Sequence, residues 1–423
     1  MAPFVWLPAH LPMAPRPLAG ELLSSWLGRL AAANALDFGE VLELVHARLA
    51  RPRAGECHAG ELDYACSRPR LQALSTLSRL PAARIAALSL KRRFGPLGLF
   101  WLSHDTAPVY DAHYRLVLRP QVRPGYCVEC LREQTRQGQP AHLRAEWALA
   151  FLTHCPRHRA VGLRYGCRDC REVASLGWGL GRGQPPTMGC GRCAVGPEGV
   201  AFLERPPPLS GRQEGVLRLE AALLAALGVE GQGQRAPDPR WAGAVRPATF
   251  VRLVGELIEM LGWPDAGGGF SLLEHLQRGS CRAPEPVWRP LPAGCEPFGG
   301  LGRQERFELL AGVVELLGSG LGEDRPPGKP APFGCLYGPL SAERRGAFLE
   351  RLQRWPERVR RRALAAVACF QSAPRTRGSH GCTQKKGVSP SLAERFNCKK
   401  AGLLNELAAK SPPERVAERF NCK

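Results

Sequence analysis

The chain has 423 residues, and its 58 lysines and arginines exceed its 38 acidic residues, which gives a formal net charge of +20 at pH 7. This charge favours a polyanionic partner such as nucleic acid. Hydrophobic residues make up 44% and charged residues 23% of the chain, a globular composition that excludes wholesale disorder. Because leucine, alanine and arginine dominate over aromatic residues, we expect a mainly helical protein with few strands, in two or three domains.

The opening residues do not have the pattern of a signal peptide, and no stretch approaches the roughly 18 consecutive apolar residues of a membrane helix. We therefore expect a soluble protein of the cytoplasm. Because that compartment is reducing, the 16 cysteines do not predict a disulfide framework. Their spacing decides between metal ligands and small buried side chains.

The first hundred residues are expected to form short helices. Leucines at helical spacing predict a helix from about Leu22 that closes at Asn34. Asp37, followed three residues later by Glu40, is a capping-box signal for a second helix, so the turn between the two helices is very short.

Two more helices are expected in this part of the chain. Leucines predict a third helix over residues 71–80, ended by Pro81, and a fourth, short helix over residues 85–90. Two helices across a tight turn with a supporting helix fit a helix-turn-helix, and they equally fit any small helical bundle.

The centre of the chain is distinguished by cysteines in pairs. Cys127 and Cys130 are followed, after 24 residues, by Cys155 and His158. Two tight knuckles with this spacing can turn all four side chains toward one ion, so we predict a tetrahedral zinc site with three cysteines and one histidine. His154 is an alternative ligand, but the Cys-x2-His knuckle fits better, and we expect His154 at the surface.

A second group of four cysteines has the same paired spacing, with thiolates at all four ligand positions. The pairs are Cys167 with Cys170 and, after 19 residues, Cys190 with Cys193. We predict a second, all-cysteine zinc site and hence two zinc ions per chain, both structural because all ligands come from the protein. The other nine cysteines show no ligand spacing. Redox CxxC chemistry would need a cysteine pair at a helix N-terminus beside a βαβ pattern, and neither is visible in the sequence.

Residues after the proline run at 206–208 are predicted to form a helical region. Ser210 with Gln213 is a second capping box. Apolar stripes and two final helices complete the expected set, over residues 250–261, 307–317, 341–352 and 357–370.

No enzyme motif is found, and we expect a protein that is not an enzyme. Scattered acids such as Asp105, Asp111 and Glu146 do not assemble into a nuclease site from sequence, and the default expectation for each is solvated surface charge. A zinc-dependent enzyme would need a metal with an open coordination position.

Basic residues concentrate at the end of the chain. Residues 341–423 hold 19 lysines and arginines against 7 acids, a difference of +12. The densest group consists of Arg358, Arg360, Arg361 and Arg362. Phosphate binding and simple solvation are both open for these four residues.

The tail contains an exact repeat. The heptapeptide AERFNCK occurs at residues 393–399 and again at 417–423, with a period of 24 residues. One and a half such units cannot bury a core. A basic appendage and the remnant of a truncated repeat or disturbed reading frame both stay open.

Several of these motifs together resemble the TniQ family of transposon target-selection proteins. The resemblance spans roughly residues 5–195, and its most specific parts are Glu-x3-Ser-Trp-Leu-x-Arg-Leu-Ala-x2-Asn over 21–34 and the segment 147–158 that enters the first knuckle. One departure is Ala35, where the family commonly has glycine at the helix end. This departure puts the geometry of the turn after Asn34 in doubt.

The resemblance implies a helix-turn-helix combined with zinc-ribbon modules and no transposase activity. It implies partners as well: a target-marking element, which is DNA or a CRISPR guide-RNA complex, and an AAA+ ATPase that recruits the transposase. A homodimer is a further option. A zinc-containing, sequence-specific transcriptional regulator is the alternative function.

The expected organisation has four parts. They are an N-terminal helix-turn-helix-like bundle, two zinc-ribbon modules, a C-terminal helical domain and a basic tail that is a candidate for disorder, over residues 1–105, 106–200, 209–371 and 372–423.

Overall fold

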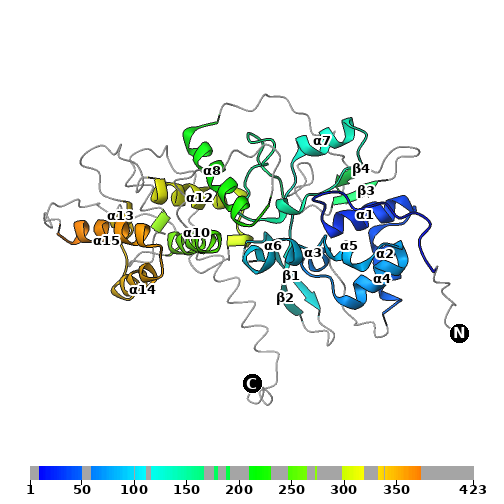
Figure 1. The fold of residues 1–423 in the computed structure, drawn as a ribbon, viewed down its shortest axis with the longest axis horizontal. Helices are drawn as coiled ribbons and strands as arrows, with labels where there is room; N and C mark the ends of the chain where they lie inside the picture. Colours follow the sequence, from blue (N-terminus) through cyan, green and yellow to red (C-terminus); the bar gives the residue numbers. More distant parts are fainter. Residues whose placement is uncertain are drawn as a thin grey trace, which may run out of the picture. The chain divides into compact units, whose positions relative to one another are not determined.

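A computed structural model describes the chain (Figure 1). It describes residues 9–49, 59–99, 101–110, 116–165, 176–179, 187–190, 209–229, 246–263, 272–273, 298–318, 332–337 and 339–372. The chain divides into two compact units, Met1–Gln371 and Ser372–Lys423. Apart from Ser372, all described residues belong to the first unit, so the repeated tail lies outside the described residues.

Six helices form the N-terminal part of the described chain. Their bounds are α1 Leu23–Ala33, α2 Phe38–His46, α3 Ala59–Tyr64, α4 Arg68–Ser78, α5 Ala82–Ala86 and α6 Leu90–Leu99. Helix α1 packs against α2 and α3, and α4 packs against α2 and α5. Apolar side chains of α1, α2, α4 and α5 are buried together in one core, which includes Trp26, Val41, Leu74 and Ile85.

The sequence located α1 and α2 correctly. Asn34 caps α1, and the Asp37 carboxylate accepts a hydrogen bond from the Glu40 amide while the Glu40 carboxylate accepts one from the Asp37 amide. Between the helices, Ala35 has a φ of 55°, in the left-handed region. The amides of Ala35 and Leu36 donate to the carbonyls of Ala32 and Ala31, which is the Schellman pattern of a helix end. The alanine therefore takes the conformation that glycine usually supplies.

The bounds of the other two predicted N-terminal helices differ from those in the structure. The third predicted helix corresponds to α4, which begins before residue 71 because Ser67-Arg68-Pro69 is a helix start with proline in the first turn. The fourth corresponds to α5, which begins directly after Pro81. Helices α3 and α6 were not predicted from the sequence.

The described strands form two antiparallel hairpins. Strand β1 His104–Tyr110 pairs with β2 Leu116–Val122, and β3 Leu176–Gly179 pairs with β4 Thr187–Cys190. Strand β3 packs against α1. The prediction of a mainly helical chain with few strands is confirmed, although the β1–β2 hairpin itself was not foreseen.

The C-terminal part is helical as predicted. It contains α8 Gly211–Ala226, α10 Pro247–Leu261, the 3-10 turn η3 Phe298–Gly300, α12 Arg303–Gly318, α13 Pro332–Tyr337, α14 Ala342–Gln353 and α15 Glu357–Ser372. The capping box of Ser210 and Gln213 starts α8. Helices α8, α10 and α12 pack on one another.

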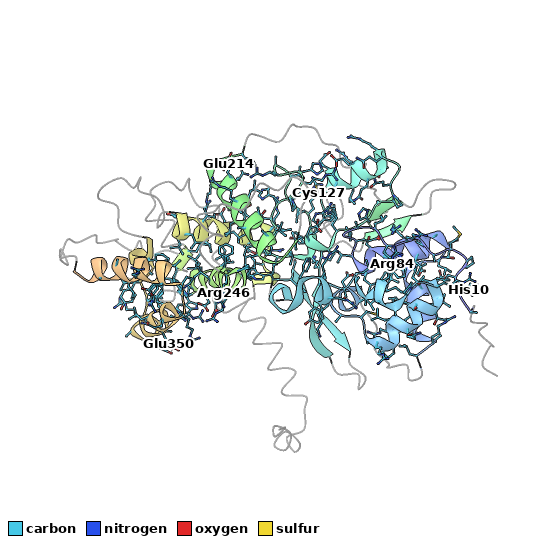
Figure 2. The ribbon with its side chains drawn as sticks, viewed as in Figure 1. His10, Arg84, Cys127, Glu214, Arg246 and Glu350 are labelled. Carbon is cyan, nitrogen blue, oxygen red and sulfur yellow. The ribbon has the colours of Figure 1, made fainter. Side chains whose placement is uncertain are left out.

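One apolar core joins the centre of the chain to these helices. It includes Leu22 and Trp147, then Val216 on α8, Leu257 on α10 and Leu310 on α12. Side chains therefore pack continuously from the N-terminal segment to the C-terminal helices (Figure 2). None of the helices in the described part of the chain has the length and hydropathy of a membrane-spanning segment.

Candidate metal centre

The first cysteine pair lies at the start of α7 Val128–Arg136. Cys127 is the N-cap residue, and Cys130 lies in the first turn. Both side chains are buried. The free amides and the positive dipole end at a helix N-terminus favour the thiolate form of cysteine, so α7 places two thiols where metal-binding thiolates are stabilised (Figure 2).

The second pair lies on a tight knuckle, Cys155-Pro156-Arg157-His158. The Val161 amide donates to the His158 carbonyl, and the Cys155 amide donates to the Val161 carbonyl at 2.9 Å, which closes the loop. The fold brings this loop to α7, so residues separated by 24 positions in sequence meet at one point.

The four predicted ligands form one cluster. Their ligand atoms all lie within 4.8 Å of one another. The Cys130 Sγ atom is 3.5 Å from Cys155 Sγ and 3.3 Å from His158 Nδ1, and Cys127 Sγ is 3.5 Å from the same nitrogen. Tetrahedral zinc, with bonds of about 2.3 Å to sulfur and about 2.0 Å to nitrogen, requires ligand separations of about 3.5 to 3.8 Å. The Cys3His group therefore has the geometry to bind a metal ion.

The electrostatics of the cluster point the same way. Interactions with the Cys127 and Cys155 sulfur atoms, together with burial, raise the pKa of Cys130. Hydrogen bonds from Cys127 and Cys130 lower the pKa of Cys155. Three thiolates at this spacing repel one another, so the cluster holds them together only beside a cation, which a divalent metal would supply.

A carboxylate orients the histidine. His158 Nε2 lies 2.9 Å from Glu133 Oε1, while Nδ1 faces the sulfur atoms. The second Glu133 oxygen pairs with Arg157 at 3.2 Å. The pKa of His158 is raised, first by its contact with Cys155 and also by Glu133. Glu133 was missed in the sequence, although it lies one turn after Cys130 on the same helix.

His154 is not a surface residue, and that expectation was wrong. The side chain is buried, its Nδ1 lies 2.9 Å from Thr153 Oγ1, and its ring packs edge-on against Phe307 of α12. Burial, followed by the charge of Arg303, lowers its pKa to about 4. His154 is therefore a neutral core residue outside the cluster, buried by a helix far along the chain.

The second cysteine set cannot be placed as a site. Cys190 ends strand β4, but its side chain lies outside the described residues. Cys167, Cys170 and Cys193 also lie outside the described residues. The all-cysteine zinc site therefore stays a prediction.

The basic group near the end of the chain lies on α15. Arg360 and Arg361 both pair with Glu357 on the preceding turn. The side chains of Arg358 and Arg362 lie outside the described residues. The phosphate-binding role of these four arginines stays a prediction.

The three acids named from the sequence do not share one environment. Glu146 is buried and pairs with Arg144, so the expectation of a solvated carboxylate was wrong for this residue. Asp105 lies in β1, with its side chain outside the described part of the chain, and Asp111 lies outside it altogether.

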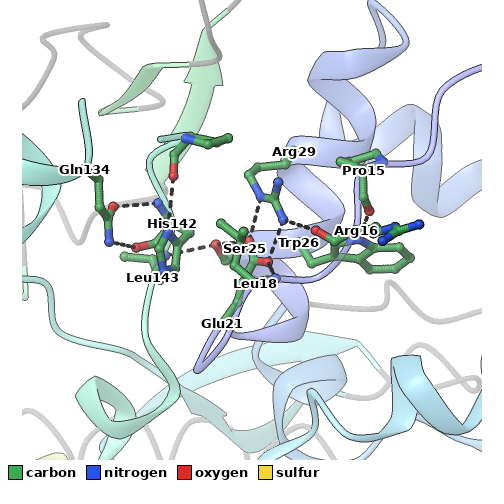
Figure 3. Close-up of polar contacts among 11 residues, drawn as sticks. Pro15, Arg16, Leu18, Glu21, Ser25, Trp26, Arg29, Gln134, His142 and Leu143 are labelled. Atoms are coloured by element: carbon green, nitrogen blue, oxygen red, sulfur yellow. Dashed lines mark hydrogen bonds and ion pairs between the residues drawn. The ribbon is translucent and has the colours of Figure 1, made fainter. Parts of the chain in front are cut away.

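A buried polar network anchors the most distinctive sequence stretch. Arg29 on α1 forms an ion pair with Glu21 at 2.7 Å, and both side chains are at most 4% exposed. Ser25 donates to Glu21 and accepts from the Leu143 amide (Figure 3). Glu21, Ser25 and Arg29 recur every four residues, so one face of the chain around α1 connects to the segment that precedes the Cys155 knuckle.

The comparison with known protein families matches residues 12–161 to TniQ. The match includes α1, the Glu21 network and all four residues of the Cys3His cluster, and it ends earlier than the span of roughly residues 5–195 expected from the motifs. No curated protein matches the chain. TniQ family proteins are generally non-catalytic transposition proteins. On this match and this geometry, residues 12–161 of the chain are a TniQ family domain.

Proposed function

We propose that this chain is a non-catalytic accessory protein of DNA transposition, which selects or marks the target and connects it to an AAA+ ATPase and a transposase. The observation that carries the proposal is the TniQ domain over residues 12–161. The net charge of +20 supports a role in contact with nucleic acid, either target DNA or the guide-RNA complex of a CRISPR-associated transposon.

The metal of the Cys3His cluster in this proposal is zinc, in a structural role. Three sulfur atoms and one nitrogen atom form a sulfur-rich set of ligands, which zinc prefers. Four protein ligands fill a tetrahedral site and leave no coordination position for a substrate. The ion would fix the Cys155 knuckle against the start of α7. A second zinc ion, held by Cys167, Cys170, Cys190 and Cys193, completes the proposed content of two per chain.

Helices α1 and α2 are the proposed helix-turn-helix. The turn between them comprises residues 34–37 and is fixed at both ends, by the Schellman contacts of Ala35 and by the Asp37–Glu40 capping box. Asn34 adds a second restraint, because its side-chain amide donates to the Met13 carbonyl and its oxygen accepts from the Met13 amide at 3.0 Å. A rigid turn of this kind is what a DNA-reading helix pair requires.

The decisive experiment is a pull-down of the tagged full chain from its native cells, with any AAA+ ATPase and transposase that are encoded beside it co-expressed. We expect the ATPase to co-purify when ATP and DNA are present, and transposition to be lost when the chain is deleted. A chain that binds one defined duplex sequence, captures no ATPase and leaves transposition unchanged would instead be a transcriptional regulator.

A further inference from the structure

The stretch of chain that contains α4, α5 and α6 carries positive charge without negative charge. Residues 64–104 hold seven lysines and arginines and no acidic residue, whereas the whole chain has 38 acidic residues among 423. Protein surfaces usually intersperse both signs of charge, and a field of one sign attracts an oppositely charged partner. This stretch is therefore a candidate surface for a polyanion. Its basic residues are Arg68, Arg70, Arg79, Arg84, Lys91, Arg92 and Arg93.

Three of these side chains lie on consecutive exposed turns. Along residues 81–93, backbone amides donate to carbonyls three or four residues earlier, so the chain coils helically through α5 into α6. Arg84 (Figure 2) and Lys91 are seven residues apart, which is about two helical turns, and both are exposed. Ala87 between them and Arg92 beside Lys91 are exposed as well. The other side of these turns is buried in the core and consists of Ile85, Ala86, Leu88 and Leu90. We call Arg84, Lys91 and Arg92 the α5–α6 basic row.

No carboxylate in the described part of the chain pairs with the α5–α6 basic row. Exposed arginines on other helices differ in this respect. Arg252 on α10 pairs with Glu256 at 3.0 Å, and Arg354 at the end of α14 pairs with Glu350 at 2.7 Å. Each of those pairs lies within one stretch of helix, at a spacing of four residues. The row has no such local partner because its own stretch of chain contains no acidic residue, so its charge is available to another molecule.

Two flanking arginines are not counted in the row, because each has a neighbour of its own. Arg79 contacts the imidazole of His10. The Arg93 guanidinium and the Glu146 carboxylate both lie within 4.0 Å of the position that a Cβ atom would take at Gly20. The row is therefore restricted to the three basic side chains that have no such neighbour among the described residues.

Helix α2, the second helix of the proposed helix-turn-helix, carries the opposite charge. Its exposed residues are Gly39, Glu40 and Glu43, and none of them is basic. Carboxylates on this face repel phosphate groups, so α2 is poorly suited to contact a nucleic-acid backbone. Within the N-terminal helices, the contact with phosphates is therefore expected at α5 and α6.

We propose that the α5–α6 basic row binds the phosphate backbone of a nucleic-acid duplex. This proposal rests on the proposed function and assigns a surface to it. Arg84 and Lys91 are roughly 10 to 17 Å apart along the helical turns. Duplex DNA carries one charge per about 1.7 Å of its axis, so several phosphates lie within reach of the row. The small side chain of Ala87 lets the backbone approach between the two cations. Such contacts position the duplex without reading its sequence.

The test is fluorescence anisotropy with labelled duplex DNA of mixed sequence, measured for the zinc-loaded full chain over a series of salt concentrations. We expect the double variant Arg84→Gln with Lys91→Gln to bind about 10- to 100-fold more weakly than the wild type. Its salt slope should be smaller by about 2, as for two lost phosphate contacts. Arg84→Lys with Lys91→Arg keeps both charges and should bind like the wild type. Circular dichroism and zinc content should be unchanged in both variants, because the substituted side chains are exposed.

The matched control is the double variant Arg252→Gln with Arg354→Gln. It removes the same number of positive charges, but from residues that already pair with a glutamate. Its affinity and salt slope should stay close to those of the wild type. If the two double variants behave alike, the row is refuted as a binding surface, while the proposed function stands.

Glu43→Gln tests where the phosphates lie. Glu43 is an exposed carboxylate on α2, outside the row, so its neutralisation should change the affinity by no more than about twofold, because solvent and salt screen a distant charge. A clear gain in affinity together with a steeper salt slope would place the phosphates along α2 and contradict the assignment to α5 and α6.

A labelled RNA duplex, measured in the same way, identifies the source of the phosphates. If the row variant loses binding to RNA and keeps binding to DNA, the row is supported and its partner is RNA. A wild-type chain that binds neither duplex would contradict the nucleic-acid role in the proposed function as well as the row. Unchanged binding to both duplexes, with loss of the ATPase in the pull-down, would mean that the row binds an acidic protein and that the nucleic-acid assignment is wrong.

Discussion

Glu133 holds the imidazole of His158 from the side opposite the sulfur atoms: His158 Nε2–H donates to Glu133 Oε1 over 2.9 Å, and Nδ1 faces the three thiols. A carboxylate behind a metal-binding histidine fixes its tautomer and orientation and makes the ligating nitrogen more basic. Glu133 belongs to α7, which also carries Cys130, so one helix supplies a ligand and the group that orients another ligand.

Glu133→Gln should therefore lower zinc affinity by about 10- to 100-fold. Competition with a chromophoric chelator measures this change directly. Glu129→Gln is the control, because Glu129 lies on the same helix and pairs with Arg132 instead of a ligand. Equal zinc affinities for the two variants would show that Glu133 does not act on His158.

Zinc content should separate the two predicted sites. Cys127→Ser is expected to reduce the content from two zinc ions to one per chain, because the Cys3His cluster loses a thiolate. Cys167→Ser should also leave one ion, in the Cys3His cluster, because it removes a thiolate from the all-cysteine set. Elemental analysis of the purified chain gives both numbers. A wild-type content of one zinc, unaffected by Cys167→Ser, would remove the second site.

The Glu21–Arg29 pair should be essential for the stability of the domain. Removing one partner leaves the other charge buried and unpaired, which typically costs about 3 to 5 kcal/mol. We expect Arg29→Met to lower the free energy of unfolding by that amount in urea titrations. Arg29→Met combined with Glu21→Leu should recover much of the loss. A double variant as unstable as the single one would contradict this explanation.

The turn after α1 offers a stabilising substitution. Ala35 adopts a φ of 55°, where a side chain costs about 1 kcal/mol more than glycine. Ala35→Gly should therefore raise the free energy of unfolding by somewhat less than about 1 kcal/mol, since glycine is more flexible when unfolded. Ala33→Gly, in the last helical position of α1, is the control and should destabilise by a similar amount.

Asp63 should make stability depend on pH. It accepts hydrogen bonds from the Ser24 amide and hydroxyl at 2.7 and 2.6 Å, and burial raises its pKa from 3.8 to about 6. Between these two values the folded protein binds more protons than the unfolded chain. The free energy of unfolding should therefore fall as pH rises, by at most about 1.4 kcal/mol per pH unit, and level off above the folded-state pKa.

Asp63→Asn removes this titration while keeping an oxygen for the Ser24 amide. Urea titrations from pH 5 to pH 7, with zinc content checked at each pH, should show a smaller fall for the variant than for the wild type. Parallel curves would mean that the carboxyl group titrates normally in the folded state.

Local signals in the sequence were enough to predict where the two helices with capping boxes begin. Asp37 with Glu40 and Ser210 with Gln213 each place a helix start from residues only three positions apart. Ligand spacing was likewise enough to identify the four residues of the Cys3His cluster. In both cases the interacting groups are determined by short stretches of chain.

Contacts between distant segments were not predictable in this way. Asp63 caps the start of α1 from a different helix, and Phe307 buries His154 from α12. The β1–β2 hairpin was hidden because Pro108 and Pro120 lie within its strands, and proline argues against a strand when it is read in isolation. Burial of Glu146 depends on tertiary packing as well, so a charge count could not reveal it.

The contacts of Thr153 and Ala150 have a consequence for dissecting this protein. The Thr153 amide and hydroxyl donate to Glu220 on α8, and the Ala150 carbonyl accepts from Arg306 on α12. A fragment cut at residue 161 would lose both partners and leave Phe151 and Leu152, now fully buried, without the helices that share their core. The smallest fragment that keeps these contacts thus extends through α12, well past residue 161, where the match to the TniQ family ends.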